Sequence, residues 1–195
     1  MINAIVLAAG ESQRMGKPKP LLRFQDKTFL EHIVTVLQEV RVDRVTVVLG
    51  ARAEVILEAI ELRDVDVTVN RDYERGQLSS LIWGLKGIPM QAEAILLCLV
   101  DHPFLTIPVV NRVIDAFKQT NAPIVIPTYN RKRGHPTLFS HAVFDQLISA
   151  SMGKGARQVV HSNEDKVHEV PVSDSAILTG VNTPDQYRSH FGEDP

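Results

Sequence analysis

The chain has 195 residues and a formal net charge of −2, so no global field favours a nucleic acid or an anionic membrane as partner. Its one cysteine excludes an intrachain disulfide and a cysteine zinc site. A secretory leader is not visible, and no apolar run approaches the roughly 20 residues that span a bilayer, so we expect a cytoplasmic protein.

Short apolar runs alternate with amphipathic segments through the first two thirds of the chain. Thr28 and Glu31 form a capping-box pattern before one helix, and Thr106 precedes another. Such alternation predicts βαβ units and a mainly parallel sheet. Strands are predicted at 4–8, 44–50, 66–70, 94–100 and 123–129, and further helices at 52–62, 77–87 and 106–119.

The last third of the chain departs from this rhythm. RKRGHPTLF (131–139) predicts a turn and a short strand, followed by a helix near 140–150. VHEVPV (167–172) predicts an antiparallel strand, and VNTPDQYRSHF (181–191) a closing helix. Because no linker or repeat interrupts the chain, we expect one α/β domain over residues 1–195, with antiparallel elements in its C-terminal third.

A loop rich in glycine and cations follows the first strand. LAAGESQRMGKPK (7–19) has the spacing of neither a P-loop nor a GxGxxG fingerprint. Its small residues nevertheless let backbone N–H groups approach an anion, while Arg14 and Lys19 supply positive charge. The alternative is a solvated surface loop. Ligands of open α/β sheets bind outside the carboxyl ends of strands, where segments 7–19, 70–80 and 101–103 are expected to meet.

LAAGESQRMGKPK resembles the LAAGxSxRMGxxK loop of molybdenum-cofactor-type nucleotidyltransferases, the MobA-like NTP transferases. The resemblance continues through NRDYERGQLSSL, LVDHP, RGHPTLF, GKGAR and VNTPD, and it covers essentially the whole chain. GQLSS and GHP are more similar to the cytidylyl-transferring branch than to the guanylyl-transferring one. The resemblance implies a Rossmann-like three-layer α/β/α domain of the nucleotide-diphospho-sugar transferase type.

The resemblance also implies roles for residues that would hold the nucleotide. The small residues of the loop and Arg14 would cradle the triphosphate, and Lys19 would contact the phosphate under attack. Asn70 and residues 76–80 would surround the base, although the serines there also fit simple helix caps. The implied nucleotide-binding residues are Leu7, Ala8, Ala9, Gly10, Arg14, Lys19, Asn70, Gly76, Ser79 and Ser80.

Two oxygen-bearing side chains are implied ligands of Mg²⁺. Asp101 follows the most apolar strand, although aspartate is also common in turns of this kind. Asn182 is the implied second ligand, and it equally fits the position that precedes the cap of the closing helix. Lys19, Arg14 and Asp101 are accordingly the implied catalytic residues.

The motifs DHP and GHP would face the acceptor. They contribute His102, Gly134, His135 and Pro136. A contact with the nucleotide is also open for His102, and a loop or buried structural role competes for each histidine. The basic turn 131–133 and the cations of GKGAR would either meet an anionic acceptor or form a solvated face. No general base is required, because an acceptor phosphate is already ionised.

Together these features predict a magnesium-dependent nucleotidyltransferase. CTP is the favoured donor and molybdopterin the implied phosphorylated acceptor, with pyrophosphate released. Two other hypotheses stay open: the same chemistry on a sugar phosphate or another phosphorylated small molecule, and a non-catalytic nucleotide-binding chaperone that delivers a cofactor to a molybdoenzyme. Such a molybdoenzyme is the one protein partner implied.

Overall fold

A single large sheet runs through the computed structural model, which describes residues 1–195. A separate small hairpin joins β2 (Arg23–Phe24) to β3 (Lys27–Thr28). The strands of the large sheet are β1 (Ile2–Ala8), β4 (Arg44–Leu49), β5 (Asp66–Val69), β6 (Ala94–Leu99), β7 (Ile124–Tyr129), β8 (Lys132–Arg133), β9 (Thr137–Ser140) and β10 (Val167–Pro171). They follow the order β10-β7-β9-β6-β1-β4-β5, and β8 pairs with β7.

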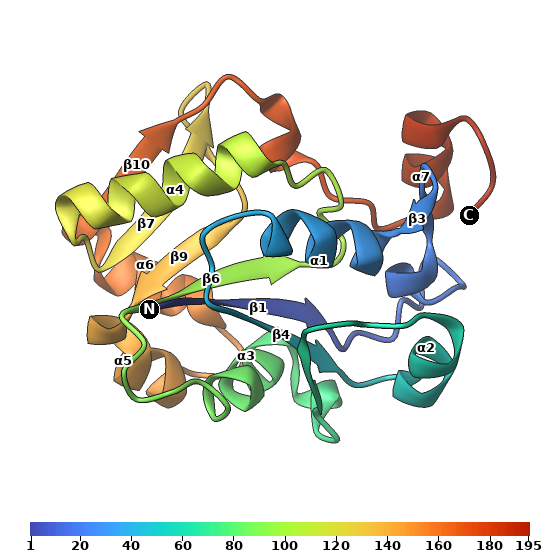
Figure 1. Cartoon of the computed structure of the whole chain (residues 1–195), viewed down its shortest axis with the longest axis horizontal. Helices are drawn as coiled ribbons and strands as arrows, with labels where there is room; N and C mark the ends of the chain where they lie inside the picture. Colours follow the sequence, from blue (N-terminus) through green and yellow to red (C-terminus); the bar gives the residue numbers. More distant parts are fainter.

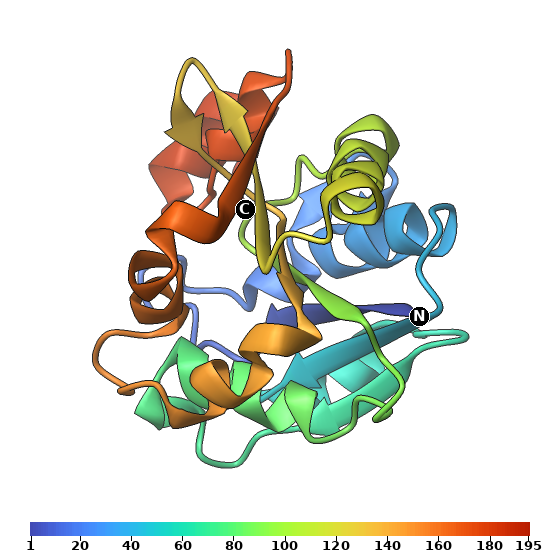
Figure 2. The same cartoon turned by 90° about the vertical axis from the view of Figure 1, so that its left-hand side faces the viewer.

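Helices cover both faces of this sheet (Figures 1 and 2). The α-helices are α1 (Phe29–Gln38), α2 (Ala53–Ala59), α3 (Gln77–Leu85), α4 (Ile107–Thr120), α5 (Phe144–Ser149), α6 (Ala156–Ser162) and α7 (Pro184–Phe191). The short 3₁₀ turns are η1 (Lys19–Leu21), η2 (Tyr73–Arg75), η3 (His141–Val143), η4 (Glu164–Lys166) and η5 (Ser175–Leu178). Each helix that the amphipathic and capping patterns predict is present in the structure. Helix α6 was not predicted.

Alternation along β1 divides the core into two layers. Ala4 and Val6 belong to the larger cluster of buried apolar residues, which also contains side chains of α1, α2 and α4. Ile5 and Leu7 belong to the smaller cluster, with side chains of α3, α5 and α6. Successive side chains of a strand point to opposite faces of the sheet, so alternate residues of β1 contact different helical layers. The predicted three-layer α/β/α arrangement is confirmed.

Strand directions confirm a mainly parallel sheet with antiparallel pairing in the last third. β1 pairs in parallel with β4 and β6, whereas β9 runs antiparallel to β6 and β7. The predicted antiparallel strand at 167–172 is wrong in direction, because β10 pairs in parallel with β7, Val167 lying opposite Ile124. The reason is that β9 returns the chain to the end of the sheet where β7 begins, and β10 starts from that end.

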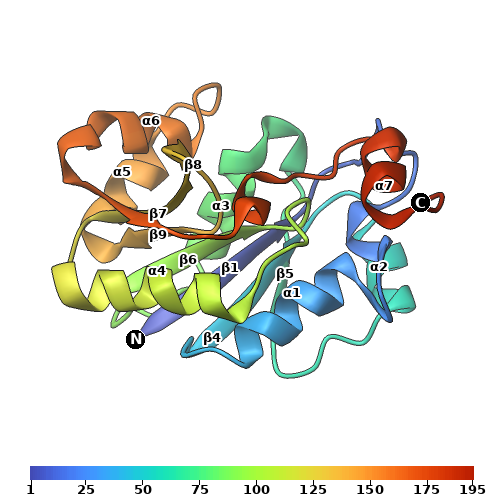
Figure 3. The same cartoon turned by 90° about the horizontal axis from the view of Figure 1, so that it is seen from above.

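The carboxyl ends of β1, β4 and β6 point toward one end of the molecule, where α7 and the C-terminus also lie (Figures 1 and 3). The capping box at the start of α1 is confirmed, with the Thr28 hydroxyl accepting from the Glu31 N–H and the Glu31 carboxylate accepting from the Thr28 N–H. Thr106 occupies the N-cap of α4, but its hydroxyl forms no capping hydrogen bond. None of the helices combines the length and apolar character that a bilayer crossing requires.

Candidate nucleotide-binding site

The loop after β1 is anchored at its middle and folded back on itself. Met15 is buried in the larger core cluster, whereas Gly10, Glu11 and Arg14 stay exposed above the sheet. The Ser12 hydroxyl accepts a hydrogen bond from the backbone N–H of Lys19 at 3.0 Å. The loop therefore holds its small residues on one side and Lys19 on the other, around a shared opening.

Two adjoining cavities occupy this opening. The first has a volume of about 220 Å³ and the second, which is more open, about 550 Å³. A Cβ atom built at Gly10 would meet no other atom within 4 Å, so the backbone there faces free space. The first cavity is lined by Leu7, Ala8, Ala9, Gly10, Ser12, Lys19, Pro20, Tyr73, Gly76, Gln77, Ser80, Val100 and Asp101. The three strand-end segments that were expected to meet do so here.

Lys19 joins two oxygen-bearing side chains at the mouth of these cavities. Its ammonium donates to Oδ1 of Asn182 at 2.6 Å and to Oδ2 of Asp101 at 3.2 Å. The backbone N–H of Val181 also donates to the carbonyl oxygen of Asp101 at 2.7 Å, which ties the segment before α7 to the end of β6. Three elements that are distant in sequence thus converge on one positive charge.

A largely buried aromatic cluster packs the β2–β3 hairpin and α1 against α7. The rings of Phe24, Phe29, Tyr187 and Phe191 pack with centroids between 4.6 and 6.5 Å apart. The Tyr187 hydroxyl donates to the carbonyl oxygen of Arg23 at 3.0 Å. Because the β2–β3 hairpin follows Lys19 and α7 follows Asn182, this packing holds the loop against the segment that carries the second oxygen ligand.

The side of the site formed by residues 70–80 differs from the prediction in one respect. Asn70 is only 1% exposed; its Nδ2 donates to the hydroxyls of Ser79 and Ser80, and its Oδ1 accepts from the N–H of Asp72. The expected direct contact of Asn70 with the base does not match this geometry, since both carboxamide atoms are already used within the protein. Ser79 is likewise turned inward, and Ser80 with Gly76 lines the cavity.

Gly76 introduces α3 with a backbone conformation that favours glycine. Its φ is 99° and its ψ 177°, a region that other residues enter only with strain. Gln77 and Ser80, in the first turn of α3, line the cavity together with Gly76. A helix N-terminus adds partial positive charge, which suits a polyanion.

Several lining residues were missed at the sequence level. Ser12 and Gln77 lie within quoted motifs, where their polar side chains were a usable signal. Tyr73 lines both cavities, but nothing in the sequence separates it from an ordinary aromatic side chain in a loop. Pro20 and Val100 also line the first cavity. The only indication of this in the sequence is that they are adjacent to Lys19 and Asp101, respectively.

Three residues within or near the motifs lie away from the two cavities. The Trp83 indole donates to Thr68, on the α3 face near the edge strand, and lines neither cavity. Lys17 is exposed and contacts the carbonyl oxygen of Pro195. Cys98 is buried in β6, and that burial raises the pKa of its thiol.

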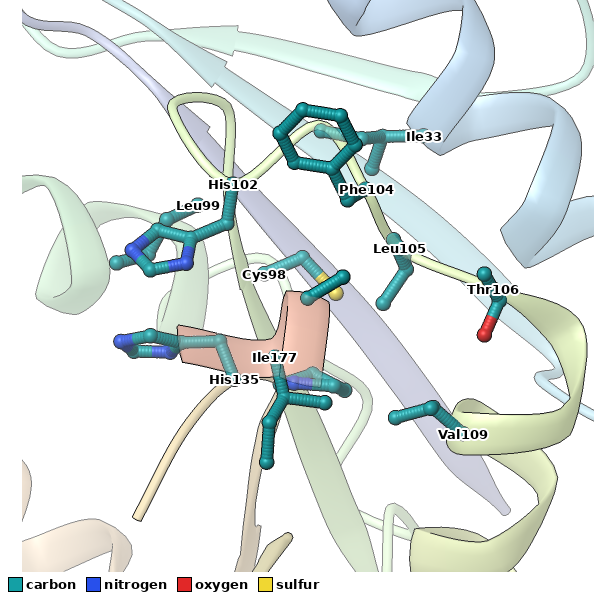
Figure 4. A pocket seen from close by; sticks show the side chains of 12 residues that line it. Ile33, Cys98, Leu99, His102, Phe104, Leu105, Thr106, Val109, His135 and Ile177 are labelled. Carbon is teal, nitrogen blue, oxygen red and sulfur yellow. The ribbon is translucent and has the colours of Figure 1, made fainter. Parts of the chain in front are cut away.

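The two histidines of the acceptor-side motifs lie against each other (Figure 4). The ring centroids of His102 and His135 are 4.5 Å apart, and Nδ1 of each is buried without a hydrogen-bond partner. Burial, followed by the neighbouring His102 ring, lowers the pKa of His135 to about 4, and burial also lowers the pKa of His102. Both rings are therefore neutral near pH 7 and offer an acceptor polar contacts rather than charge.

Apolar side chains lie on the other side of this pair, among them Phe104, Leu105 and Ile177 (Figure 4). Pro136 lines the same narrow cavity. Gly134 does not: a Cβ there would lie 2.4 Å from the carbonyl oxygen of Ile177. Gly134 therefore has a packing role, because its missing side chain lets η5 approach the β8–β9 turn. The expected contact of Gly134 with the acceptor stays a prediction.

The basic turn after β7 is not free to meet an anion at Arg133. Its guanidinium forms a bidentate pair with Glu164 and a further ion pair with Glu169, and these contacts raise its pKa. Arg157 in GKGAR differs, since it forms no ion pair and lies near enough to His135 to help lower the pKa of that ring. Arg157 is therefore an unpaired cation close to the two histidines.

The oxygens of Asp101 and Asn182 fit a hard divalent cation. No group of three or more His, Cys, Asp or Glu side chains is arranged to hold a metal ion. Mg²⁺ commonly takes one or two protein oxygens and completes its shell with phosphate oxygens and water. The ammonium of Lys19 already stands between these two oxygens, which shows that they can share one cation.

Comparison with known proteins agrees with this site. Residues 4–167 match the MobA-like NTP transferase domain. The chain belongs to the MobA-like NTP transferase family. It is a nucleotidyltransferase, related to the molybdenum cofactor cytidylyl- and guanylyltransferases.

Individual relatives of this MobA-like transferase carry different names. Molybdenum cofactor cytidylyltransferase of Escherichia coli K12 is 28% identical over 188 residues, covering 95% of this chain and 93% of that one. Nicotine blue oxidoreductase of Paenarthrobacter nicotinovorans is 27% identical over 197 residues, covering 95% and 94%. The crystal structure of Rv0371c from Mycobacterium tuberculosis H37Rv is 34% identical with a TM-score of 0.89, covering 98% and 97%. A second structure of Rv0371c, 31% identical with a TM-score of 0.85 and 98% of each chain covered, is a complex with manganese, which supports a divalent metal in this fold.

Proposed function

We propose that this MobA-like transferase acts as one unit over residues 1–195 and moves CMP from CTP to a phosphorylated acceptor, with molybdopterin as the first acceptor to test. The observation that carries the proposal is the convergence of Lys19, Asp101 and Asn182 at the mouth of a cleft walled by small residues. The preference for CTP is supported by the GQLSS and GHP motifs and by similarity to the Escherichia coli cytidylyltransferase.

The nucleotide is proposed to span the two cavities. The triphosphate lies against the backbone N–H groups of Ala8–Gly10 and the exposed guanidinium of Arg14, and the base lies toward Gly76 and Ser80. A guanidinium binds two phosphate oxygens at once, and backbone N–H groups bind phosphate where no side chain intervenes. Asn70 acts one step removed, by positioning Ser80 beside the base.

In the proposed reaction, an oxygen of the acceptor phosphate attacks the α-phosphorus of CTP. A new P–O bond forms there, the bond from the α-phosphorus to the β-phosphate oxygen breaks in line, and pyrophosphate leaves with the bonding electrons. Lys19 contacts the α-phosphate and stabilises its added negative charge. Bound at Asp101 and Asn182, Mg²⁺ would supply further positive charge against the triphosphate.

Neutral His102 and His135 would hold the acceptor by hydrogen bonds, and Arg157 would supply the charge that the imidazoles lack. This division suits an acceptor with both a polar heterocycle and a phosphate, which is why molybdopterin is tested before a simple sugar phosphate. Neither histidine is needed to remove a proton, because the attacking phosphate oxygen is already ionised.

Pyrophosphate release from CTP, GTP, UTP and ATP, each with molybdopterin or sugar phosphates as acceptor, tests the proposal. CTP with molybdopterin should give the fastest release, and a sugar phosphate that reacts faster would replace the acceptor assignment. Asp101→Asn should lower release by ~100-fold or more, the usual scale for loss of transition-state charge stabilisation. Asp115→Asn, an exposed position on α4 without an ion pair, is the matched control and should react like the unaltered protein.

Two results would contradict the proposed function. Undiminished release by Asp101→Asn would remove Asp101 from the reaction. Nucleotide binding in a thermal-shift assay without pyrophosphate release for any acceptor would support the chaperone hypothesis instead, since binding alone stabilises the folded protein.

A further inference from the structure

The ammonium of Lys19 occupies the position that a divalent cation would need. Nζ lies 2.6 Å from Oδ1 of Asn182 and 3.2 Å from Oδ2 of Asp101, so both oxygens that would ligate the metal are hydrogen-bonded to it. The Lys19 and Asp101 side chains are 15% and 26% exposed, which limits screening of charge by water. A divalent ion placed on the same oxygens would meet the ammonium at contact distance, where like charges repel strongly.

We infer that Lys19 competes with free divalent cations for Asp101 and Asn182, and that the protein therefore takes up its metal as a complex with a nucleoside triphosphate. This inference rests on the proposed function, because it assumes that the two oxygens hold the metal. Lys19 lines both cavities beside Gly10 and Ser12, so an entering triphosphate offers new oxygens to its ammonium. Once the ammonium has moved to the phosphates, the two ligand oxygens are free for the cation that the nucleotide carries.

The surroundings allow this exchange without rearrangement of the backbone. The N–H of Lys19 stays bonded to the Ser12 hydroxyl, so only the flexible four-carbon side chain has to move. The ligand oxygens also keep their places: the carbonyl of Asp101 accepts from the N–H of Val181, and the N–H of Asn182 donates to Oε1 of Gln186. Asp101 forms no ion pair other than the one with Lys19, so no second cation takes over when the ammonium leaves.

Binding of Mn²⁺ alone, followed by the electron paramagnetic resonance signal of the free ion, tests the inference without any turnover. Lys19→Met removes the ammonium and should bind Mn²⁺ about tenfold more tightly than the unaltered protein, because a competing unit charge is gone. Lys19→Gln keeps a polar side chain and should show the same direction. Lys17→Met is the matched control: it removes an exposed charge two residues away and should change Mn²⁺ affinity by less than about twofold.

A second arm adds a CTP analogue that cannot release pyrophosphate. The analogue should strengthen Mn²⁺ binding to the unaltered protein, and this gain should shrink in Lys19→Met, where no ammonium has to be withdrawn. If Asp101→Asn abolishes Mn²⁺ binding but Lys19→Met and Lys19→Gln bind no more tightly than the unaltered protein, the inference is overturned and the metal site stands. If no Mn²⁺ binding depends on Asp101, with or without the analogue, the metal role in the proposed function fails and the inference fails with it.

Discussion

Replacing His135 with asparagine is expected to reduce the loss in the free energy of unfolding that occurs as the pH falls below about 6.5. The His135 ring packs against His102 at 4.5 Å, and burial, followed by that neighbour, lowers its pKa from 6.5 to about 4. The unfolded chain therefore binds a proton at a higher pH than the folded protein does. His135 leaves stability unchanged above pH 6.5, and the free energy of unfolding falls as the pH drops from there toward 4.

The size of this effect follows from the two pKa values of His135. Between about pH 7.5 and about pH 5, the difference in proton binding costs the folded protein about 2 kcal/mol. Urea unfolding at both pH values should therefore show a loss about 2 kcal/mol smaller in His135→Asn than in the unaltered protein. Equal losses in the two proteins, or an NMR titration that places the ring pKa at its ordinary value, would refute the reasoning.

Two further predictions concern the packing that holds the site together. Tyr187→Phe removes the hydrogen bond to the carbonyl of Arg23 and should lower the free energy of unfolding by about 1 kcal/mol in urea titrations; an unchanged value would show that this bond does not tether α7. Gly134→Ala places a Cβ 2.4 Å from the carbonyl oxygen of Ile177 and should destabilise the protein by about 1–3 kcal/mol, measured in the same way, whereas an unchanged stability would mean that η5 moves aside freely.

The layered fold was predictable because buried parallel strands read as continuous apolar runs. The runs at 4–8, 44–50 and 94–100 all form neighbouring strands of the sheet, since few other structures bury nearly every side chain of a short segment. Strand direction was not predictable at 167–172, because alternation along one segment carries no information about its partner. Helix α6 was missed because GKGARQVVHSN offers only two adjacent valines as an apolar signal.

Sequence predicts which residues lie at the site when this depends on their position at the end of a strand. It does not predict the direction in which a side chain points. Lys19, Asp101 and Asn182 were expected near the same edge, and the structure brings them together. Asn70 was placed at the right strand end, but sequence cannot show that its carboxamide turns inward to the serines. Gly134 lies in the GHP motif, for which the resemblance implies a functional role. Its close packing against Ile177 could not be predicted, because Ile177 lies more than 40 residues later in the chain.

A crystal of the protein grown with Mn²⁺ and a CTP analogue tests the central claim most directly. The anomalous signal of manganese should lie between Asp101 and Asn182, with the triphosphate against Ala8–Gly10 and the Lys19 ammonium on phosphate oxygens. Manganese elsewhere, or a nucleotide bound away from the loop while Lys19 keeps its contacts with Asp101 and Asn182, would contradict the account.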